Sequence, residues 1–277
     1  MKILDGRELA GFIKERQAAE VRQLRSEGLL PELVIIRDSD NPVIVKYVHL
    51  KQAYGEDIGV AVSDVFTKDV REAILEANED ASVSGIIVQL PLSDTAQTDE
   101  VVSLINPSKD VDGLAQGVLD LEFVKHGGAG QTNNTFDSAT ATAVNWLLTG
   151  YDISLSDKKI ALVGRGRLVG APLYRMFVNS GFDVSVFGHD SDLEVLRDFD
   201  VVISATGVPG LIKSAMIKPG TVLVDAGTAS EGGKLVGDVS PEVLKRTDLA
   251  AVTPPTGGVG PLTVAALFDN ALRAARG

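Results

Sequence analysis

One stretch decides the fold: Lys159-Ile160-Ala161-Leu162-Val163-Gly164-Arg165-Gly166-Arg167-Leu168-Val169-Gly170. A short apolar run stops at a glycine pair, and small and apolar residues that can open a helix follow it. This order is typical of the strand, turn and helix of a nucleotide-binding βαβ unit. Its glycines permit a tight turn and let backbone N–H groups approach a phosphate at the helix N-terminus. The stretch therefore predicts a dinucleotide site around Gly164, Gly166 and Gly170.

The late position of this turn predicts a second domain. The chain has 277 residues, enough for two α/β lobes, and the residues before 159 must form a lobe of their own. That lobe is expected to hold the substrate and to comprise residues 1–138, with a C-terminal helix over 262–277 packing back on it. Residues 139–261 are expected to form the dinucleotide-binding lobe. A stretch from Ala115 to Asp137, with Gly127-Gly128-Ala129-Gly130 at its centre, has the composition of a linker.

Composition narrows the class of protein. The chain is 44% hydrophobic and 23% charged, as soluble globular proteins are, and its formal net charge is −12. This acidic balance argues against nucleic acid and anionic membrane surfaces as partners. The sequence has no cysteine, and His49, His126 and His189 lack metal-type spacing, so no disulfide, thiolate nucleophile or metal site is expected. Without a cleavable signal or a long apolar stretch, the expected location is the cytoplasm.

Apolar periodicity predicts helices that alternate with strands. Helices are expected over residues 6–27, 42–56, 70–77, 139–148 and 261–275. Strands are expected over residues 33–36, 60–66, 85–91, 160–163, 184–187, 201–204 and 222–225. Such alternation indicates parallel sheets, and the fold class is therefore α/β with two lobes, the second of Rossmann type.

Parallel sheets bind ligands beyond the carboxyl ends of their strands, so residues at those ends are candidates for the site. Gln89 places a polar side chain at the end of one expected strand. Ser204-Ala205-Thr206-Gly207 follows another, where small residues would let a flat nicotinamide or ribose lie against the backbone. Asp225-Ala226-Gly227-Thr228 repeats that design on the next strand.

Three further strings could carry chemistry or could be structural. Tyr47 and Lys51 lie four apart on a helix and share a face, and their spacing alone favours a lysine stem packed on a tyrosine. Lys109-Asp110-Val111-Asp112-Gly113 reads as a polar turn, although a carboxylate there could bind a ring that carries an amide N–H and an exocyclic amine. The run from Thr253 to Thr263 combines prolines that fix the chain with glycines that expose backbone, which usually serves close approach to a ligand.

Together these strings resemble the methylenetetrahydrofolate dehydrogenase/cyclohydrolase family. The matching strings are Tyr47-Val48-His49-Leu50-Lys51, Gly85 to Leu92, Lys109 to Gly113, Val163 to Pro172, and Thr253 to Thr263. They run in the family's order from one end of the chain to the other. The resemblance implies oxidation of 5,10-methylenetetrahydrofolate by hydride transfer to NAD(P), followed by hydrolysis of the methenyl product to 10-formyltetrahydrofolate. It also implies tetrahydrofolate derivatives as ligands, a folate cleft between the lobes, and a homodimer.

The resemblance assigns roles to residues. Lys51 would serve the attack of water and its proton transfers, with Gln89 orienting it, Tyr47 stacking on the folate and Asp112 anchoring the pterin edge. The residues implied to contact the substrate are Tyr47, Leu90, Pro91, Asp112, Gly258, Gly260 and Pro261. The residues implied to contact the cofactor are Thr140, Gly164, Arg165, Gly166, Val169, Gly170, His189, Asp190, Ala205, Thr206, Gly207, Gly227 and Thr228.

The chain departs from the family pattern mainly around the cofactor. Gly166 replaces a serine in the glycine turn, and Asp190 stands where a serine can meet the 2′-phosphate of NADP. A carboxylate there would repel that phosphate unless Arg165 or Arg167 compensated, so NADP is the expected cofactor with NAD as an alternative. Ser138 to Ala143 lacks two prolines and a glycine of the family, and Ile44 and Pro255-Thr256 also depart from its pattern.

Two alternative functions stay open. One is another two-lobed dehydrogenase, such as an enzyme acting on shikimate, although no Ser-x-Ser site precedes the first lysine motif. The other is a catalytically weakened homologue that binds folate or a protein partner without turnover. The altered cofactor loop is consistent with this alternative.

Overall fold

The structure is a computed structural model, and it describes residues 1–115, 120, 136–227, 229–231 and 234–277. The chain divides into two compact units. One, the three-stranded unit, lies within Gly11–Leu119, Thr132–Ala139 and Val264–Gly277. The other, the six-stranded unit, lies within Met1–Ala10, Asp120–Gln131 and Thr140–Thr263. Helices α1 (Gly6–Ser26) and α8 (Val259–Ala274) each contribute residues to both units.

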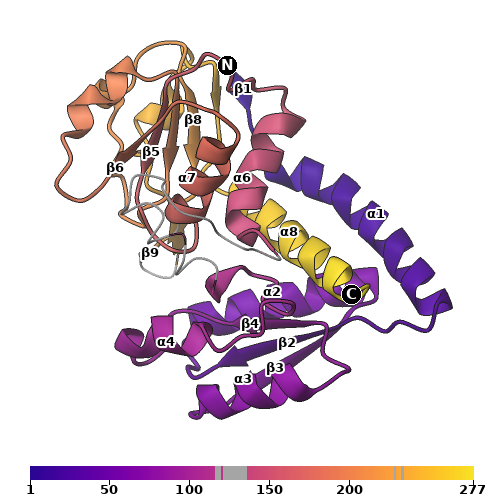
Figure 1. The fold of residues 1–277 in the computed structure, drawn as a ribbon. Coiled ribbons are helices and arrows are strands. Elements are labelled where there is room, and N and C mark those ends of the chain that lie inside the picture. The colour runs from indigo at the N-terminus through magenta and orange to yellow at the C-terminus, as the bar shows by residue number, and fades with distance from the viewer. Residues whose placement is uncertain (116–119, 121–135, 228, 232–233) are drawn as a thin grey trace. The chain divides into compact units, whose positions relative to one another are not determined.

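The three-stranded unit is built on a parallel sheet in the order β3-β2-β4. Its strands are β2 (Glu32–Arg37), β3 (Ala61–Phe66) and β4 (Gly85–Val88), and β2 pairs with both neighbours. Helices α2 (Pro42–Ile58) and α3 (Val70–Glu79) cover opposite faces, and the short α4 (Thr98–Val102) follows a 3-10 turn at Thr95–Gln97 (Figure 1). This winding brings the carboxyl ends of the three strands to one edge.

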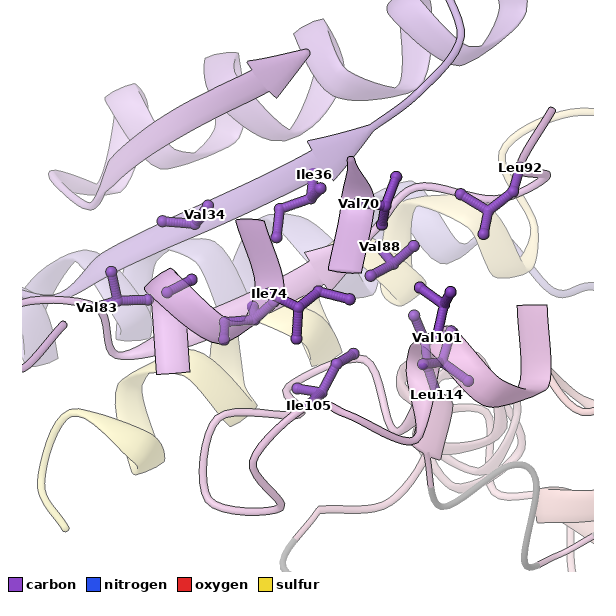
Figure 2. Close-up of a cluster of buried hydrophobic side chains, with 13 residues drawn as sticks. Val34, Ile36, Val70, Ile74, Val83, Val88, Leu92, Val101, Ile105 and Leu114 are labelled. Carbon is purple, nitrogen blue, oxygen red and sulfur yellow. The ribbon is translucent and has the colours of Figure 1, made fainter. Parts of the chain in front are cut away.

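A core of branched aliphatic side chains fills the space between this sheet and α3 (Figure 2). Val34, Ile36 and Val88 project from the sheet onto Ile74 of α3, and Ile105 closes the cluster. Buried β-branched residues suit parallel strands because both faces of such a sheet are covered. Asp69 caps α3 by accepting a hydrogen bond from the backbone N–H of Glu72 at 3.0 Å.

Helix α2 has clear start and stop signals. Asn41 is its N-cap and accepts a hydrogen bond from the backbone N–H of Val43 at 2.9 Å, while Pro42 occupies the first turn. Gly59 ends the helix in the left-handed conformation, with φ of 88°, which a glycine adopts without a Cβ penalty. The apolar face that includes Val48 is buried, so the helix presents Tyr47 and Lys51 from a fixed backbone.

The six-stranded unit contains a parallel sheet in the order β1-β11-β8-β7-β5-β6. In chain order its strands are β1 (Lys2–Ile3), β5 (Ile160–Val163), β6 (Val184–Phe187), β7 (Val201–Ser204), β8 (Val222–Asp225) and β11 (Ala251–Val252). Helices α6 (Ala139–Gly150) and α7 (Gly170–Asn179) accompany it, with 3-10 turns at Leu193–Asp198, Ser214–Met216 and Val243–Lys245. A small antiparallel pair, β9 (Ala229–Glu231) and β10 (Lys234–Val236), follows β8.

The predicted α/β class with parallel sheets is confirmed, and every helix and strand expected above is present within a few residues of its predicted bounds. The sequence pattern missed β1 and β11, which are two residues long and pair with each other. This pairing groups Met1–Ala10 with the six-stranded unit, whereas the predicted first lobe began at residue 1. Val264–Gly277 belong to the three-stranded unit. The predicted glycine-rich centre of the linker, 127–130, lies outside the described residues.

Two features are absent from the described residues. None of their helices has both the length and the apolar character needed to cross a bilayer. Nor do they contain a group of three or more His, Asp or Glu side chains that could hold a metal ion.

Candidate active site

The chemistry-bearing side chains of the three-stranded unit meet at the carboxyl edge of its sheet. Lys51 projects from α2, and Gln89 follows β4 directly, its backbone N–H donating to the carbonyl of Ile36 at 2.8 Å. The Lys51 ammonium Nζ donates a hydrogen bond to Gln89 Oε1 at 2.6 Å. The structure therefore joins two residues that lie 38 positions apart in sequence, and Gln89 directly follows a strand, as its sequence position predicted.

Burial shifts the pKa values of Lys51 and Asp112 at this edge. Desolvation lowers the pKa of Lys51, and the nearby carboxyl of Asp112 opposes that effect. Desolvation raises the pKa of Asp112, and the charge of Lys51 opposes it in turn. A lowered pKa makes the neutral amine, which can accept a proton, more accessible than it is for an ordinary surface lysine.

In the turn from Lys109 to Gly113, Lys109 and Asp110 make hydrogen bonds that hold the local backbone, whereas Asp112 interacts with Lys51. Lys109 Nζ donates to the carbonyls of Ala77, Asn78 and Asp80 at 3.0, 2.8 and 2.7 Å, which caps the end of α3. The Asp110 carboxylate accepts hydrogen bonds from the backbone N–H groups of Leu114 and Ala115, both at 2.9 Å. Asp112, held between these anchors, is the carboxyl of the turn that interacts with Lys51.

The remaining predicted substrate residues of this unit lie around the same edge. Tyr47 is partly buried one helical turn before Lys51, and desolvation raises the pKa of its hydroxyl. Leu90 and Pro91 follow Gln89 directly, and both are at least partly exposed. Their loop is tied to the sheet by Asp38, which sequence reasoning missed: both of its carboxylate oxygens accept from the Ser93 backbone N–H, at 3.0 and 2.9 Å.

In the six-stranded unit the glycine turn has the close backbone approaches that its sequence predicted. Gly164 ends β5 with φ of 107°, and a Cβ on it would overlap the carbonyl of Ala205. A Cβ on Gly170 would overlap the carbonyl of Gly164 as α7 begins. At Gly166, by contrast, an added Cβ would meet no atom within 4 Å. The turn is thus closed by Gly164 and Gly170 and open at Gly166.

These features fit a bound dinucleotide phosphate. Val169, the N-cap of α7, makes no side-chain cap hydrogen bond. In the first turn the Ala171 backbone N–H donates to the Gly166 carbonyl at 3.0 Å and Pro172 has no N–H, so the Gly170 N–H is the first-turn donor that faces a phosphate at this end. Strand β5 lies between β6 and β7, so the chain reverses its winding direction there. In open parallel sheets such a switch point is where nucleotides bind.

The other predicted cofactor residues surround this switch point. Ala205, Thr206 and Gly207 follow β7, and Gly227 follows β8, so the parallel register brings them to the carboxyl edge next to Gly164. Thr140 is partly exposed in the first turn of α6. Thr228 lies outside the described residues.

Beyond β6 the chain presents one positive and one negative group. Arg165 lies with its guanidinium against Gly188, where a Cβ would overlap it. His189 and Asp190 follow, with side chains 99% and 98% exposed, and their ring nitrogen Nδ1 and carboxylate oxygen Oδ1 lie 3.0 Å apart. Both Arg165 and Asp190 are therefore available to a ligand at the end of β6.

The string from Thr253 to Thr263 spans the end of β11 and the start of α8. Gly6 donates its backbone N–H to the carbonyl of Gly257 at 2.9 Å, and a Cβ on Gly6 would overlap the carbonyl of Gly258. Gly258 is buried under this contact, whereas Gly260 is exposed and Pro261 is partly exposed. These three predicted substrate residues belong to the six-stranded unit.

Comparison with known proteins gives concordant matches to both units. The family model "Tetrahydrofolate dehydrogenase/cyclohydrolase, catalytic domain" matches residues 4–112. The model "Tetrahydrofolate dehydrogenase/cyclohydrolase, NAD(P)-binding domain" matches residues 138–277. The bifunctional protein FolD of Hydrogenobaculum sp. is 39% identical over 282 residues, covering 99% of this chain and 98% of that protein.

Solved structures of the same family also match this chain over nearly its full length. The bifunctional enzyme FolD from Campylobacter jejuni superposes with a TM-score of 0.88 at 35% identity, covering 100% of this chain and 99% of the other. The Trypanosoma brucei enzyme, complexed with NADP and an inhibitor, gives a TM-score of 0.88 at 30% identity, covering 99% and 97%. A shikimate 5-dehydrogenase from Thermus thermophilus reaches only 0.52 at 14% identity, which is a likeness of fold alone.

Proposed function

Because the chain belongs to the tetrahydrofolate dehydrogenase/cyclohydrolase family, we propose that it carries both of the family's activities. It oxidises 5,10-methylenetetrahydrofolate to the 5,10-methenyl cation and then hydrolyses that cation to 10-formyltetrahydrofolate. A bound nicotinamide dinucleotide accepts the hydride of the first step. The observation that carries the proposal is the 2.6 Å hydrogen bond from Lys51 to Gln89 at a site where burial lowers the lysine pKa.

In the hydrolysis Lys51 handles protons. A neutral Nζ accepts a proton from the water that attacks the methenyl carbon, which gives a neutral hydroxyl adduct. The proton of that hydroxyl then passes to the folate N5 as the C–N5 bond breaks and the formyl C=O forms, so one proton is released overall. Gln89 fixes Nζ through a neutral acceptor, which orients the amine without the pKa increase that a carboxylate would cause. Asp112 binds the pterin edge, and Tyr47 stacks on the ring.

The residues proposed to hold the cofactor are backbone groups and one cation. The N-terminus of α7 and the open position at Gly166 receive the phosphates, and Ala205 to Gly207 and Gly227 line the nicotinamide half. NADP is the proposed cofactor because the Arg165 guanidinium lies against Gly188, just after β6, where the Rossmann fold meets the adenosine ribose. Asp190 opposes the 2′-phosphate and allows NAD to compete. Titration of both dinucleotides against the purified protein measures the balance.

A direct assay tests the two activities. Purified protein with methylenetetrahydrofolate and NADP or NAD should produce the absorbance of the methenyl compound, and methenyl compound added alone should decay faster than its uncatalysed hydrolysis. No methenyl product with either dinucleotide would refute the dehydrogenase. Folate binding by calorimetry without dinucleotide binding would instead identify a weakened homologue.

The proposal also covers the location of the protein, its oligomeric state and its independence of metal ions and nucleic acid. The enzyme works in the cytoplasm as a homodimer formed through the six-stranded unit, where β6 is an edge strand. It needs neither a metal nor a nucleic acid. Chelator should therefore leave both rates unchanged, and sedimentation should give twice the mass of one chain. A monomer at assay concentrations, or a rate that chelator abolishes, would overturn the corresponding statement.

A further inference from the structure

Two carboxyls without assigned roles, Asp238 fully buried and Asp225 partly buried, lie under the loops that the proposed function gives to the cofactor. Asp225 is the last residue of β8, and Asp238 follows β10 with no exposed surface. In the described part of the chain, neither forms an ion pair with Lys, Arg or His. A buried carboxyl without a cation needs hydrogen bonds to compensate its desolvation.

Asp238 is bonded to the end of β7. Its Oδ2 accepts from the hydroxyl of Ser204 at 2.6 Å and from the backbone N–H of Thr206 at 2.7 Å. Ser204 is itself fully buried. These two bonds fix the backbone of the Ala205–Gly207 loop, which the proposed function places against the cofactor.

Asp225 in turn holds Asp238 in place. Its Oδ1 accepts from the backbone N–H groups of Gly227 and Asp238 at 3.0 and 3.1 Å, and its Oδ2 accepts from that of Val239 at 2.9 Å. A Cβ on Gly237 would overlap the Asp225 carboxylate, so glycine is required for this contact. The two carboxyls thus tie the chain after β10 to the ends of β7 and β8.

The second carboxylate oxygen of Asp238, Oδ1, is not used to hold the loop. Oδ1 is buried and has no hydrogen-bond partner among the described residues. A Cβ on Gly227 would overlap it, so the oxygen lies directly behind the Gly227 backbone. Burial and the neighbouring Asp238 raise the pKa of Asp225 to about 6.

We propose that Asp238 is a positioning residue that also favours the oxidised cofactor. Its Oδ2 fixes the Ala205–Gly207 loop, and the buried negative charge on Oδ1 attracts the cationic nicotinamide ring of the oxidised form across the Gly227 backbone. The reduced form has a neutral ring and gains only from the loop. This inference rests on the proposed function, because it uses the same loops as cofactor ligands.

Asp238→Asn tests the charge while keeping a similar shape. The amide oxygen can still accept from Ser204 and Thr206, and the amide nitrogen takes the place of Oδ1. Calorimetry should show the Kd of the oxidised dinucleotide rising by about tenfold or more, with the Kd of the reduced form rising severalfold less. Cyclohydrolase activity, which depends on Lys51 in the three-stranded unit, should persist and reports that the variant is folded there.

Ser204→Ala is the matched control, because it removes one bond to the loop and leaves the charge. Both Kd values should rise by the same factor, so their ratio stays at the wild-type value. Equal changes of both Kd values in Asp238→Asn would overturn the role of the charge. Unchanged Kd values in Ser204→Ala would overturn the positioning role, even if Asp238→Asn could not be purified. A wild-type protein that binds neither form would instead contradict the proposed function itself.

Discussion

Lys51 unites a desolvated amine with a neutral hydrogen-bond acceptor, and this combination predicts how its variants behave. Lys51→Met keeps the length of the side chain and removes the amine that is proposed to accept the proton of water. We expect cyclohydrolase activity to fall by roughly 10²–10⁴-fold, while the circular dichroism spectrum and thermal midpoint stay close to wild type. A variant that hydrolyses the methenyl compound at the wild-type rate would contradict the role of Lys51.

Gln89 holds Lys51 through a neutral acceptor, so a charged residue in its place should change the protonation of Lys51. In Gln89→Glu a carboxylate would face Nζ at the distance where the amide oxygen now lies, 2.6 Å, and would stabilise the charged ammonium. Since the neutral amine is the active form, the rising limb of the cyclohydrolase pH profile should move to higher pH by at least about one unit. Gln89→Met is the neutral control, and its rate should fall without that upward displacement. An unmoved profile in Gln89→Glu would show that Lys51 does not act as a base.

Asp190 and Arg165 predict a change of cofactor preference. Asp190→Ser removes a negative charge two residues after Gly188, against which the Arg165 guanidinium lies, and should strengthen NADP binding relative to NAD by roughly tenfold. Arg165→Ala should shift the ratio in the opposite direction, because the 2′-phosphate loses its cation. Equal effects on both dinucleotides in both variants would mean that neither residue reaches the ribose.

At the scale of elements, the turn between β5 and α7 contains three glycines that differ in the space around them. Gly164 and Gly170 pack against backbone atoms, whereas Gly166 does not. Gly170→Ala would drive a Cβ into the carbonyl of Gly164, at an expected cost of about 1–3 kcal/mol, and would weaken dinucleotide binding. Gly166→Ala enters open space and should leave the thermal midpoint within about a degree. Differential scanning fluorimetry of both variants checks the contrast, which equal midpoints would refute.

The same turn shows what a sequence can predict. Strand β5, its glycines and α7 were predictable because an apolar run, a breaker and a helix start are local signals. Gln89 was predictable from its place after a strand. By contrast, β1 and β11 are too short for any periodicity, and their pairing joins residues about 250 positions apart.

The site residues that the sequence analysis missed also differ in whether a local sequence signal could have identified them. Asp38 stands directly after β2 and was open to the argument that found Gln89. Asp225 was noticed as part of a strand end, but its partnership with Asp238 depends on a return of the chain after β10, which no local pattern announces. The two residues that Lys51 interacts with likewise come from separate strings and required the fold to bring them together.

At the scale of the whole molecule, α1 and α8 each run from one unit into the other without a break in the helix. Unfolding of one unit removes the packing from part of each shared helix, and helix formation is cooperative along the chain, so we expect the two units to unfold together. The single tryptophan, Trp146 in α6, reports the six-stranded unit, and cyclohydrolase activity reports the three-stranded unit. Their thermal midpoints should therefore coincide.

Cofactor binding makes this cooperativity measurable. NADP at 100 times its Kd should stabilise the folded protein by about 2.7 kcal/mol, although its proposed ligands all lie in the six-stranded unit. If unfolding is cooperative, the midpoint for loss of cyclohydrolase activity should rise together with the midpoint of Trp146 fluorescence. Gly170→Ala, which is expected to bind the dinucleotide more weakly, should show a smaller rise of both midpoints at the same NADP concentration. A cofactor that raises the fluorescence midpoint and leaves the activity midpoint unchanged would show that the two units unfold separately despite the helices they share.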